Sequence, residues 1–322
     1  MNILLLTSGI TLDQLSHVIK TFDLSADNQF YFNGRSMDDR NLAEMDIVFG
    51  WDAKVMSKLL NMKHARLKWV QAYSAGVDYY PLTQLANRKI LLSNVSGIHA
   101  EPIAENVLGM ILSFYRGLHT AAANQVQQQW QAPNTPLTLA SGKQMVIFGT
   151  GHIGSRIAEL AQAFKIQVIG VNRSGHPVKA FPQTTAMTQV DSDLLKKTDI
   201  IVNALPLTPD TKGFYNRDFF KLAANRPLFV SIGRGPSTVT NDLVEALQAG
   251  QLGGAALDVT DPEPLPADNP LWTMPNVIIT PHISGLYQNY LHDAFAIFAE
   301  NLHQFKTTGT LAKNEINLKT GY

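Results

Sequence analysis

The sequence predicts an α/β fold of two doubly wound parallel-sheet domains with a cleft between them, and three observations lead there. Its 322 residues exceed the usual size of a single domain. Short apolar runs alternate with helical patterns along most of the chain, which is typical of βαβ units. A glycine-rich turn stands between one apolar run and a helical pattern near the middle. The predicted domains are residues 1–100 plus 287–322, and residues 101–286.

The first domain is predicted to contain five strands, and a distant helix returns to it. Apolar runs indicate strands over residues 3–6, 30–32, 47–50, 69–72 and 90–92. From Glu101 a helical pattern with Pro102 in its first turn predicts a long helix that could join the domains. Residues 125–141 lack periodicity, which predicts an arm or a subunit contact. Residues 293–306 read as a helix that could return to the first domain.

The second domain is predicted to contain a strand from Met145 and further strands over residues 167–171, 199–204, 228–232, 254–258 and 277–280.

The 26 basic residues balance the 26 acidic ones, so we expect neither nucleic acid nor an anionic membrane surface as a partner. The absence of cysteine excludes thiolate catalysis and Cys-ligated metals. The apolar start is too short for a signal peptide, and no run could span a bilayer, so we expect a cytoplasmic protein.

The segment VIFGTGHIG at residues 146–154 carries a G-x-G-x-x-G fingerprint of a Rossmann-like dinucleotide site. Its first glycine permits the tight turn, the second lets the backbone approach a pyrophosphate, and the third lets the helix pack on the strand. Glycine triplets alone are weak evidence, but the flanking strand and helix patterns are those the site requires. The fingerprint assigns to the cofactor site Gly149, Gly151, His152, Ile153 and Gly154.

Three polar residues follow predicted strands of the second domain: Arg234, Glu263 and His282. Ligands of open α/β sheets bind beyond the carboxyl ends of the strands, so the three can converge on one cleft. Arginine offers a fork for a carboxylate, histidine exchanges a proton near neutral pH, and glutamate would orient the imidazole. Together they predict the reduction of a 2-oxo acid with His282 as proton donor, or as base in reverse. No histidine spacing predicts a metal site.

Across essentially its whole length the chain resembles the D-isomer-specific 2-hydroxyacid dehydrogenase family, in its glyoxylate/hydroxypyruvate reductase-like branch. The matching stretches are SAGVD at 74–78, the glycine fingerprint, NALPLT at 203–208, IGRG at 232–235, ALDV at 256–259, EPL at 263–265 and PHISG at 281–285. The resemblance implies that Arg234, Glu263 and His282 are catalytic, and that backbone amides of Ala75, Gly76 and Val77 hold the substrate carboxylate. It also implies that Asp258 contacts the nicotinamide carboxamide, and that the cofactor pocket is lined by Leu205, Pro206, Thr211, Ile232 and Gly233.

Each of these residues also has a purely structural interpretation. Arg234 could be a surface side chain in a glycine turn, His282 a capping residue and Glu263 a solvated loop charge. Asp78 could cap a helix. Trp51 follows a predicted strand and is counted with the substrate-binding residues, although a core aromatic fits equally well. Tyr287 and Tyr290 could close over the substrate or pack between subunits.

The residues about 20 positions beyond the fingerprint favour NADP(H) over NAD(H). An NAD site normally has an acidic residue there for the ribose 2′-hydroxyl. This chain has instead Asn172, Arg173 and Ser174. The missing carboxylate removes repulsion from a 2′-phosphate, and the arginine offers charge-assisted hydrogen bonds. NAD(H) remains open if the arginine points into solvent.

The sequence therefore predicts an NADPH-preferring 2-oxo acid reductase that makes D-2-hydroxy acids, with glyoxylate or hydroxypyruvate as the first expected substrate and a homodimer as the expected assembly. The first alternative is a phosphoglycerate dehydrogenase, which needs cations for the substrate phosphate, and Arg35, Lys54 and Lys58 are the candidates. An alternative of another class is a nucleotide-sensing, corepressor-like binding protein, because fold alone does not fix function.

Overall fold

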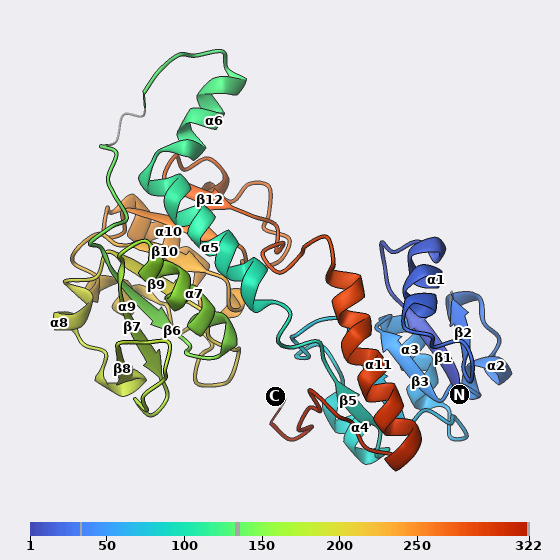
Figure 1. Cartoon of the computed structure of the whole chain (residues 1–322). Coiled ribbons are helices and arrows are strands. Elements are labelled where there is room, and N and C mark those ends of the chain that lie inside the picture. The colour runs from blue at the N-terminus through green and yellow to red at the C-terminus, as the bar shows by residue number, and fades with distance from the viewer. Residues whose placement is uncertain (33, 133–135, 321–322) are drawn as a thin grey trace. The chain divides into compact units, whose positions relative to one another are not determined.

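The computed structural model describes residues 1–32, 34–132 and 136–320, and the chain divides into two compact units (Figure 1). The first unit comprises Met1–Ile98 and Tyr287–Tyr322, and the second comprises His99–Leu286. The boundary after Ile98 lies two residues before the one expected at residue 100, and the boundary after Leu286 lies where it was expected.

The first unit is built on a five-stranded parallel sheet with the strand order β2-β1-β3-β4-β5. This is the doubly wound order in which helices cover both faces, and the middle strand of the sheet, IVFG, is apolar and buried throughout. Ile3 of the first strand pairs with Phe30 on one side and Ile47 on the other. The strands are β1 (Asn2–Leu6), β2 (Gln29–Phe32), β3 (Ile47–Gly50), β4 (Trp69–Gln71) and β5 (Leu91–Ser93).

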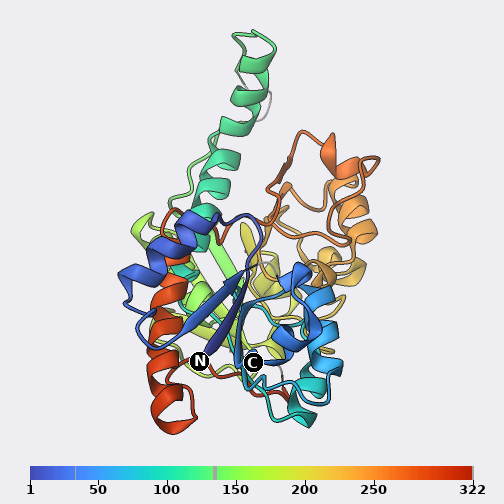
Figure 2. The ribbon, with the colours of Figure 1, turned by 90° about the vertical axis from the view of Figure 1, so that its right-hand side faces the viewer.

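The C-terminal helix belongs to the first unit because its aromatic face completes that unit's core. Phe295 packs on Phe49 with ring centroids 4.7 Å apart, and Phe298 stacks on Trp69 at 5.2 Å. Figure 2 shows this helix, in red, beside α1, in blue. The helices are α1 (Leu12–Thr21), α2 (Asp39–Ala43), α3 (Ala53–Asn61), α4 (Leu82–Asn87) and α11 (Tyr290–Thr308), with a 3-10 turn η1 (Gly34–Ser36).

The second unit is built on a seven-stranded parallel sheet with the order β12-β11-β10-β9-β6-β7-β8. The chain order reverses between β6 and β9, which is the switch point where such sheets bind ligands. The edge strand β8 was not predicted, since its sequence QTTA is polar. The strands are β6 (Gln144–Phe148), β7 (Gln167–Asn172), β8 (Gln183–Ala186), β9 (Ile200–Asn203), β10 (Leu228–Ser231), β11 (Gly254–Leu257) and β12 (Val277–Ile279).

The long helix predicted from Glu101 is α5, and Gly117, which adopts a left-handed conformation with φ +64°, starts a second helix, α6, that was not predicted. Part of the predicted arm, residues 133–135, lies outside the described residues. The helices of this unit are α5 (Ala100–Tyr115), α6 (Leu118–Val126), α7 (His152–Ala163), α8 (Ser192–Leu195), α9 (Arg217–Leu222) and α10 (Thr240–Gln248), with 3-10 turns η2 (Met187–Gln189), η3 (Gly235–Ser237) and η4 (Pro270–Trp272).

Candidate active site

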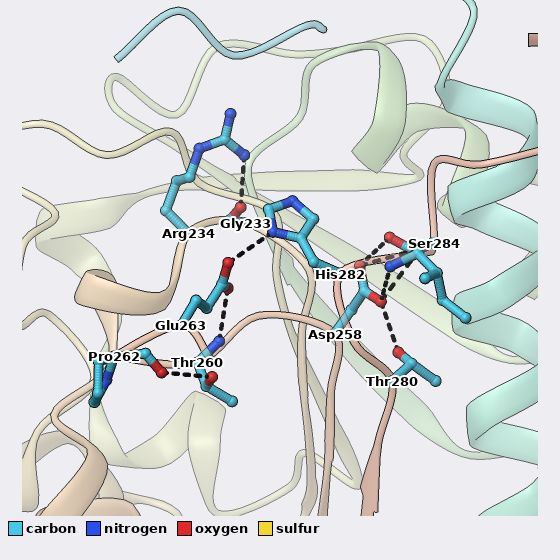
Figure 3. A network of polar contacts seen from close by, with 10 residues as sticks. Gly233, Arg234, Asp258, Thr260, Pro262, Glu263, Thr280, His282 and Ser284 are labelled. Atoms are coloured by element: carbon cyan, nitrogen blue, oxygen red, sulfur yellow. Dashed lines mark hydrogen bonds and ion pairs between the residues drawn. The ribbon is translucent and has the colours of Figure 1, made fainter. Parts of the chain in front are cut away.

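Three adjacent parallel strands bring the predicted catalytic residues to one edge of the second sheet (Figure 3). Arg234 follows β10, Glu263 follows β11 and His282 follows β12. Because the three strands are neighbours and run in the same direction, their carboxyl ends lie at the same edge. The sheet thus gathers three residues that are separated by 29 and 19 positions in the sequence.

His282 and Glu263 form a preformed pair. The Nδ1 atom of His282 lies 2.9 Å from Oε2 of Glu263, and 52% and 39% of the two side chains are exposed. The other carboxylate oxygen, Oε1, accepts a hydrogen bond from the backbone N–H of Thr260 at 3.0 Å. With Nδ1 held by the carboxylate, Nε2 is the ring atom left to exchange a proton.

Arg234 is half-buried and lies in an extended backbone conformation at the start of η3. Its Nη1 donates to the carbonyl of Gly233 at 2.9 Å, and the hydroxyl of Ser237 donates to the carbonyl of Arg234 at 2.6 Å. Figure 3 shows the guanidinium turned back over its own backbone beside the His282 ring. A guanidinium carries five N–H donors in a fixed fork, a geometry that matches a carboxylate.

The turn that carries His282 is held by Asp258, at the end of β11. His282 has a φ of +54°, a conformation that few non-glycine residues adopt. Its N–H donates to the carbonyl of Asp258 at 2.9 Å, and the next two backbone N–H groups, of Ile283 and Ser284, donate to the Asp258 carboxylate. Asp258 is 2% exposed. His282 and its turn are thereby tied to the neighbouring strand.

The turn between β6 and α7 has the geometry that a dinucleotide pyrophosphate requires. Gly149 has a φ of +103°, and a Cβ on Gly154 would lie 1.9 Å from the Gly149 carbonyl oxygen, so α7 can start this close only with glycine. A Cβ on Gly151 would meet no heavy atom within 4 Å, which leaves open space beside the helix start. Among the described residues no side chain caps α7, so the amides of His152 and Ile153 can bind an anion.

The loop after β7 is organised by Asn172, whose side chain faces the loop itself. Its Nδ2 donates to the hydroxyl of Thr150 and to the carbonyl of His176, and its Oδ1 accepts from the N–H of Gly175. Arg173 and Ser174 are exposed next to it. The Ser174 hydroxyl lies 3.0 Å from Nδ1 of His176. An exposed arginine, serine and histidine thus share the place where a ribose 2′ group would lie.

The loops after β9 and β10 contain the other predicted cofactor residues, and their polar groups are largely used within the chain. Thr211 is buried, and its hydroxyl donates to the carbonyl of Pro206 at 2.6 Å. Asn203, which sequence reasoning missed, donates to the hydroxyls of Ser231 and Ser237 and accepts from the N–H of Leu205. An asparagine at the end of an apolar strand is the signal that could have revealed it. Leu205, Ile232 and Gly233 are buried beside these contacts.

In the first unit, residues 74–77 form a loop after β4 whose carbonyls are all occupied. The Ala75 carbonyl accepts from Asn94, that of Gly76 accepts from the Ser74 hydroxyl, and that of Val77 accepts from the N–H of Tyr80. The N–H groups of Ala75, Gly76 and Val77 have no acceptor among the described residues. A loop with occupied carbonyls and available N–H groups is suited to bind an anion.

The remaining aromatic and acidic candidates of the first unit have defined places. Trp51 is half-buried, and its ring centroid lies 4.3 Å from that of Tyr80. Tyr290 is buried, donates to the carbonyl of Tyr73, and is therefore a core residue of this unit. The Tyr287 hydroxyl donates to Asp293 at 2.5 Å. The structural interpretation of Asp78 as a helix cap is wrong, since α4 begins after Pro81.

Within residues 1–32, 34–132 and 136–320, no cluster of His, Cys, Asp and Glu could hold a metal ion. In the same part of the chain, no helix combines the length and the apolar character needed to cross a membrane.

Comparison with known proteins places this geometry in a family. The model of the D-isomer specific 2-hydroxyacid dehydrogenase, NAD binding domain, matches residues 108–284. A glyoxylate reductase/hydroxypyruvate reductase of Mus musculus is 32% identical over 254 residues, which are 77% of each chain.

Two solved structures are similar over nearly the whole chain. The phosphoglycerate dehydrogenase of Lactobacillus plantarum is 39% identical with a TM-score of 0.58, and the match covers 98% of this chain and 100% of that one. The NADPH-dependent glyoxylate/hydroxypyruvate reductase of Sinorhizobium meliloti, solved with NADP and sulfate, is 26% identical with a TM-score of 0.80, and the match covers 100% and 99%. With two parallel α/β sheets, a glycine fingerprint and an Arg, Glu and His set at neighbouring strand ends, this chain belongs to the D-isomer specific 2-hydroxyacid dehydrogenase family.

Proposed function

We propose that this protein reduces a small 2-oxo acid of the glyoxylate or hydroxypyruvate type to a D-2-hydroxy acid with NADPH, and that His282 provides the proton. The observation that carries this proposal is the 2.9 Å contact between His282 Nδ1 and Glu263 Oε2 at the same sheet edge as Arg234. The name of the mouse relative, a glyoxylate reductase/hydroxypyruvate reductase, supports the substrate class.

The three side chains have complementary roles in this reaction. A bound nicotinamide supplies a hydride to C2 of the substrate. Arg234 binds the substrate carboxylate and the carbonyl oxygen and so polarises the C=O bond. Protonated His282 donates from Nε2 to the oxygen that becomes the hydroxyl, and Glu263 stabilises the imidazolium through Nδ1. In the reverse direction neutral His282 accepts the hydroxyl proton.

The backbone amides of Ala75, Gly76 and Val77 are proposed to bind the substrate carboxylate as well. Their N–H groups have no acceptor among the described residues, which supports this role. Trp51 contacts Tyr80 next to this loop and is proposed to limit the size of the group on C3. A small substrate fits such an aromatic boundary better than a bulky one.

NADPH is proposed as the preferred cofactor because no carboxylate occupies the position after β7. Arg173 is exposed there and can bind a 2′-phosphate, and Ser174 offers a hydroxyl. The Sinorhizobium meliloti enzyme is named NADPH-dependent, which supports the same choice. NADH remains the second cofactor to test.

A homodimer is proposed from the surface of α6 and the segment that follows it. None of the residues of α6 is buried, and Val126 and Trp130 are 86% and 105% exposed. A hollow at the same place is lined by residues of α6 and of the segment up to Ala132. Exposed aromatic and aliphatic side chains at one place are typical of a protein interface. A cytoplasmic location remains a prediction.

A second candidate function, phosphoglycerate dehydrogenase, is favoured by the name of the Lactobacillus plantarum structure. That reaction needs a cation for the substrate phosphate. Two of the three candidates are engaged in ion pairs, Arg35 with Asp52 and Lys58 with Asp39. This engagement makes the unphosphorylated substrate the first proposal.

The decisive experiment is the initial rate of nicotinamide oxidation by the purified protein with NADPH and with NADH. The substrates are glyoxylate, hydroxypyruvate, pyruvate, phenylpyruvate and branched 2-oxo acids, and phosphohydroxypyruvate tests the second candidate. We expect NADPH-dependent turnover that is fastest with glyoxylate and hydroxypyruvate. Turnover with the phosphorylated substrate alone would replace the first proposal by the second. Binding of NADPH without turnover of any acid would favour a nucleotide sensor.

The role of His282 is tested by His282→Ala. Loss of a general acid lowers turnover by roughly 10²- to 10⁴-fold, while nucleotide binding should not change. The measurements are kcat and the dissociation constant of NADPH from nucleotide fluorescence. A variant that loses NADPH binding in proportion to its activity would assign His282 a structural role instead.

A further inference from the structure

The stretch around the loop after β7 contains basic side chains and no acidic ones. Residues 160–190 include no Asp or Glu, although the whole chain has 26 acidic residues for 26 basic ones. Arg173, His176 and Lys179 follow the carboxyl end of β7, and all three are exposed. The next acid along the chain, Asp191, uses its side chain to cap α8. The loop is therefore suited to an anionic ligand.

Three hydrogen bonds fix the turn that carries His176. The Oδ1 of Asn172 accepts from the N–H of Gly175 at 2.7 Å, and its Nδ2 donates to the His176 carbonyl at 2.9 Å. The hydroxyl of Thr184, in the neighbouring strand β8, donates to the Gly175 carbonyl at 3.1 Å. Gly175 has a φ of +75°, and a Cβ there would lie 2.9 Å from the backbone N of Ala186. Glycine permits this turn, and the turn holds the backbone of His176 beside β7 and β8.

The imidazole of His176 is oriented by the hydroxyl of Ser174. The Oγ atom of Ser174 lies 3.0 Å from Nδ1 of the ring. A hydroxyl donates to an unprotonated Nδ1 and accepts from a protonated one, so the ring can carry a proton on Nε2 in either case. Among the described residues Nε2 has no hydrogen-bond partner. It is therefore a donor available to a ligand that only accepts.

A ribose 2′-phosphate has the chemistry that these donors match. It carries about 1.5 to 2 negative charges near neutral pH, and its ionised oxygens only accept hydrogen bonds. A nicotinamide dinucleotide held at the glycine fingerprint places its ribose 2′ group beyond the second strand of the unit, which is β7. The guanidinium of Arg173 has no partner among the described residues, and it neutralises only part of this charge. A second cationic donor at the same loop completes the match.

We propose that His176 is a third ligand of the 2′-phosphate of NADPH, beside Arg173 and Ser174. Its Nε2 donates to a phosphate oxygen, and the protonated ring adds a positive charge. NADH has a hydroxyl in place of the phosphate and gains no such charged contact, so His176 contributes to the discrimination between the two nucleotides. The inference rests on the proposed preference for NADPH.

The test variants are His176→Ala, which removes the donor and the charge, and His176→Gln, which keeps an N–H donor without the charge. We expect the dissociation constant of NADPH to rise by about 3- to 10-fold in His176→Ala, the range for one net hydrogen bond, and by less in His176→Gln. NADH should bind to both variants as it does to the unmutated protein. Equal weakening for the two nucleotides would assign His176 a structural role in the loop.

Lys179→Ala is the matched control, because Lys179 is an exposed cation of the same stretch that lies outside the turn formed by residues 172–176. Its removal should weaken NADPH binding less than His176→Ala does. An equal loss in the two variants would mean that the phosphate responds only to the general charge of the stretch, which would overturn the assignment of His176.

A double variant separates a direct contact from an effect through Ser174. If Nε2 of His176 touches the phosphate, His176→Ala weakens NADPH binding also in a Ser174→Ala background. If His176 only holds the serine hydroxyl in place, the second substitution adds no further loss. That result would contradict the inference.

Nucleotide fragments test the contact without turnover. The imidazole NMR signals of His176 are identified by their absence in His176→Ala, and we expect 2′,5′-ADP to shift them more than 5′-AMP, which lacks the 2′-phosphate. The same shift with both fragments, or none with either, would refute the contact. A protein that shows the contact but reduces no 2-oxo acid would refute the proposed function and leave the inference standing. A preference for NADPH that persists undiminished in His176→Ala would refute the inference alone.

Discussion

Asn172 and Arg173 are neighbours in the sequence, yet their side chains have different surroundings. Asn172 is 9% exposed and joins Thr150, Gly175 and the carbonyl of His176. Arg173 is exposed at the surface of the loop that Asn172 shapes. Of these two side chains only that of Arg173 is exposed, so it is the one that we propose binds a 2′-phosphate. The replacement that would favour NADH, Asn172→Asp, would also set a carboxylate against the His176 carbonyl and disturb the loop.

We therefore expect Arg173→Ala to change the cofactor preference without damage to the fold. The variant should bind NADPH about 10- to 100-fold more weakly, the range for a lost charge-assisted hydrogen bond. NADH, which lacks the 2′-phosphate, is the control ligand and should bind as before. The measurement is the dissociation constant of each nucleotide. Equal weakening for both nucleotides, or none for either, would show that Arg173 does not contact the phosphate.

At the scale of elements, two helices of the chain begin in different ways. The helix α7 begins against its own glycine turn, with Gly154 pressed on the Gly149 carbonyl. The helix α3 begins at Asp52, whose carboxylate accepts from the N–H groups of Lys54 and Val55 and pairs with Arg35. The start of α7 leaves backbone N–H groups available to a ligand. At the start of α3 the Asp52 side chain accepts hydrogen bonds from such groups.

Gly154→Ala should weaken both the fold and nucleotide binding. A methyl group 1.9 Å from the Gly149 carbonyl oxygen forces α7 to move, and overpacking of this kind costs about 1 to 3 kcal/mol. Gly109→Ala is the matched control, because Gly109 lies in α5 with open space around its Cβ position. Alanine there should stabilise the helix by about 0.5 to 1 kcal/mol. Thermal unfolding and NADPH titration measure both effects, and equal behaviour of the two variants would contradict the close approach.

Asp52→Asn tests the charged start of α3 through its pH dependence. The hydrogen bond from the Val55 N–H, together with Arg35, lowers the pKa of Asp52 below its usual 3.8. A lowered pKa means that the charge stabilises the fold at pH values above 3.8, and that this contribution is lost as the pH falls through the lowered pKa. Near neutral pH the variant should be less stable by up to about 1 kcal/mol, since the ion pair is partly exposed.

The comparison is made by urea unfolding of Asp52→Asn and the unmutated protein at several pH values. We expect the two stabilities to converge in acid. A difference that is constant from neutral pH into acid would mean that the ion pair contributes nothing and that only the cap matters.

At the scale of the whole molecule, the candidate functional residues are distributed over two units with different strand orders. The second unit carries the catalytic candidates and the glycine fingerprint, and the first carries the amide loop at residues 75–77. The first unit includes a helix that begins at Tyr290. In chain order all residues of the second unit therefore precede the last helix of the first unit. The exposed surface of α6 and the following segment belongs to the second unit.

We expect a dimer of the 35.5 kDa chain in solution and a shift towards monomer in Trp130→Asp. A charge at a large apolar side chain in an interface removes its packing and is buried at high cost. Leu12→Asp, at an exposed apolar residue at the start of α1, is the control and should leave the mass unchanged. Sedimentation equilibrium measures both. An unchanged dimer in Trp130→Asp would move the interface elsewhere.

The sequence alone determined the α/β class and nearly all strands, because these follow from local periodicity, and it predicted the ligand-binding residues from polar residues after apolar runs. It missed β8, whose polar edge residues have no strand periodicity, and the short helix α6 that follows Gly117. Only the tertiary structure showed that the Asp258 carboxylate is used by the His282 turn and that the Asn172 side chain faces its own loop. A side chain's partners depend on which strand ends are neighbours, and strand order is not encoded in local patterns.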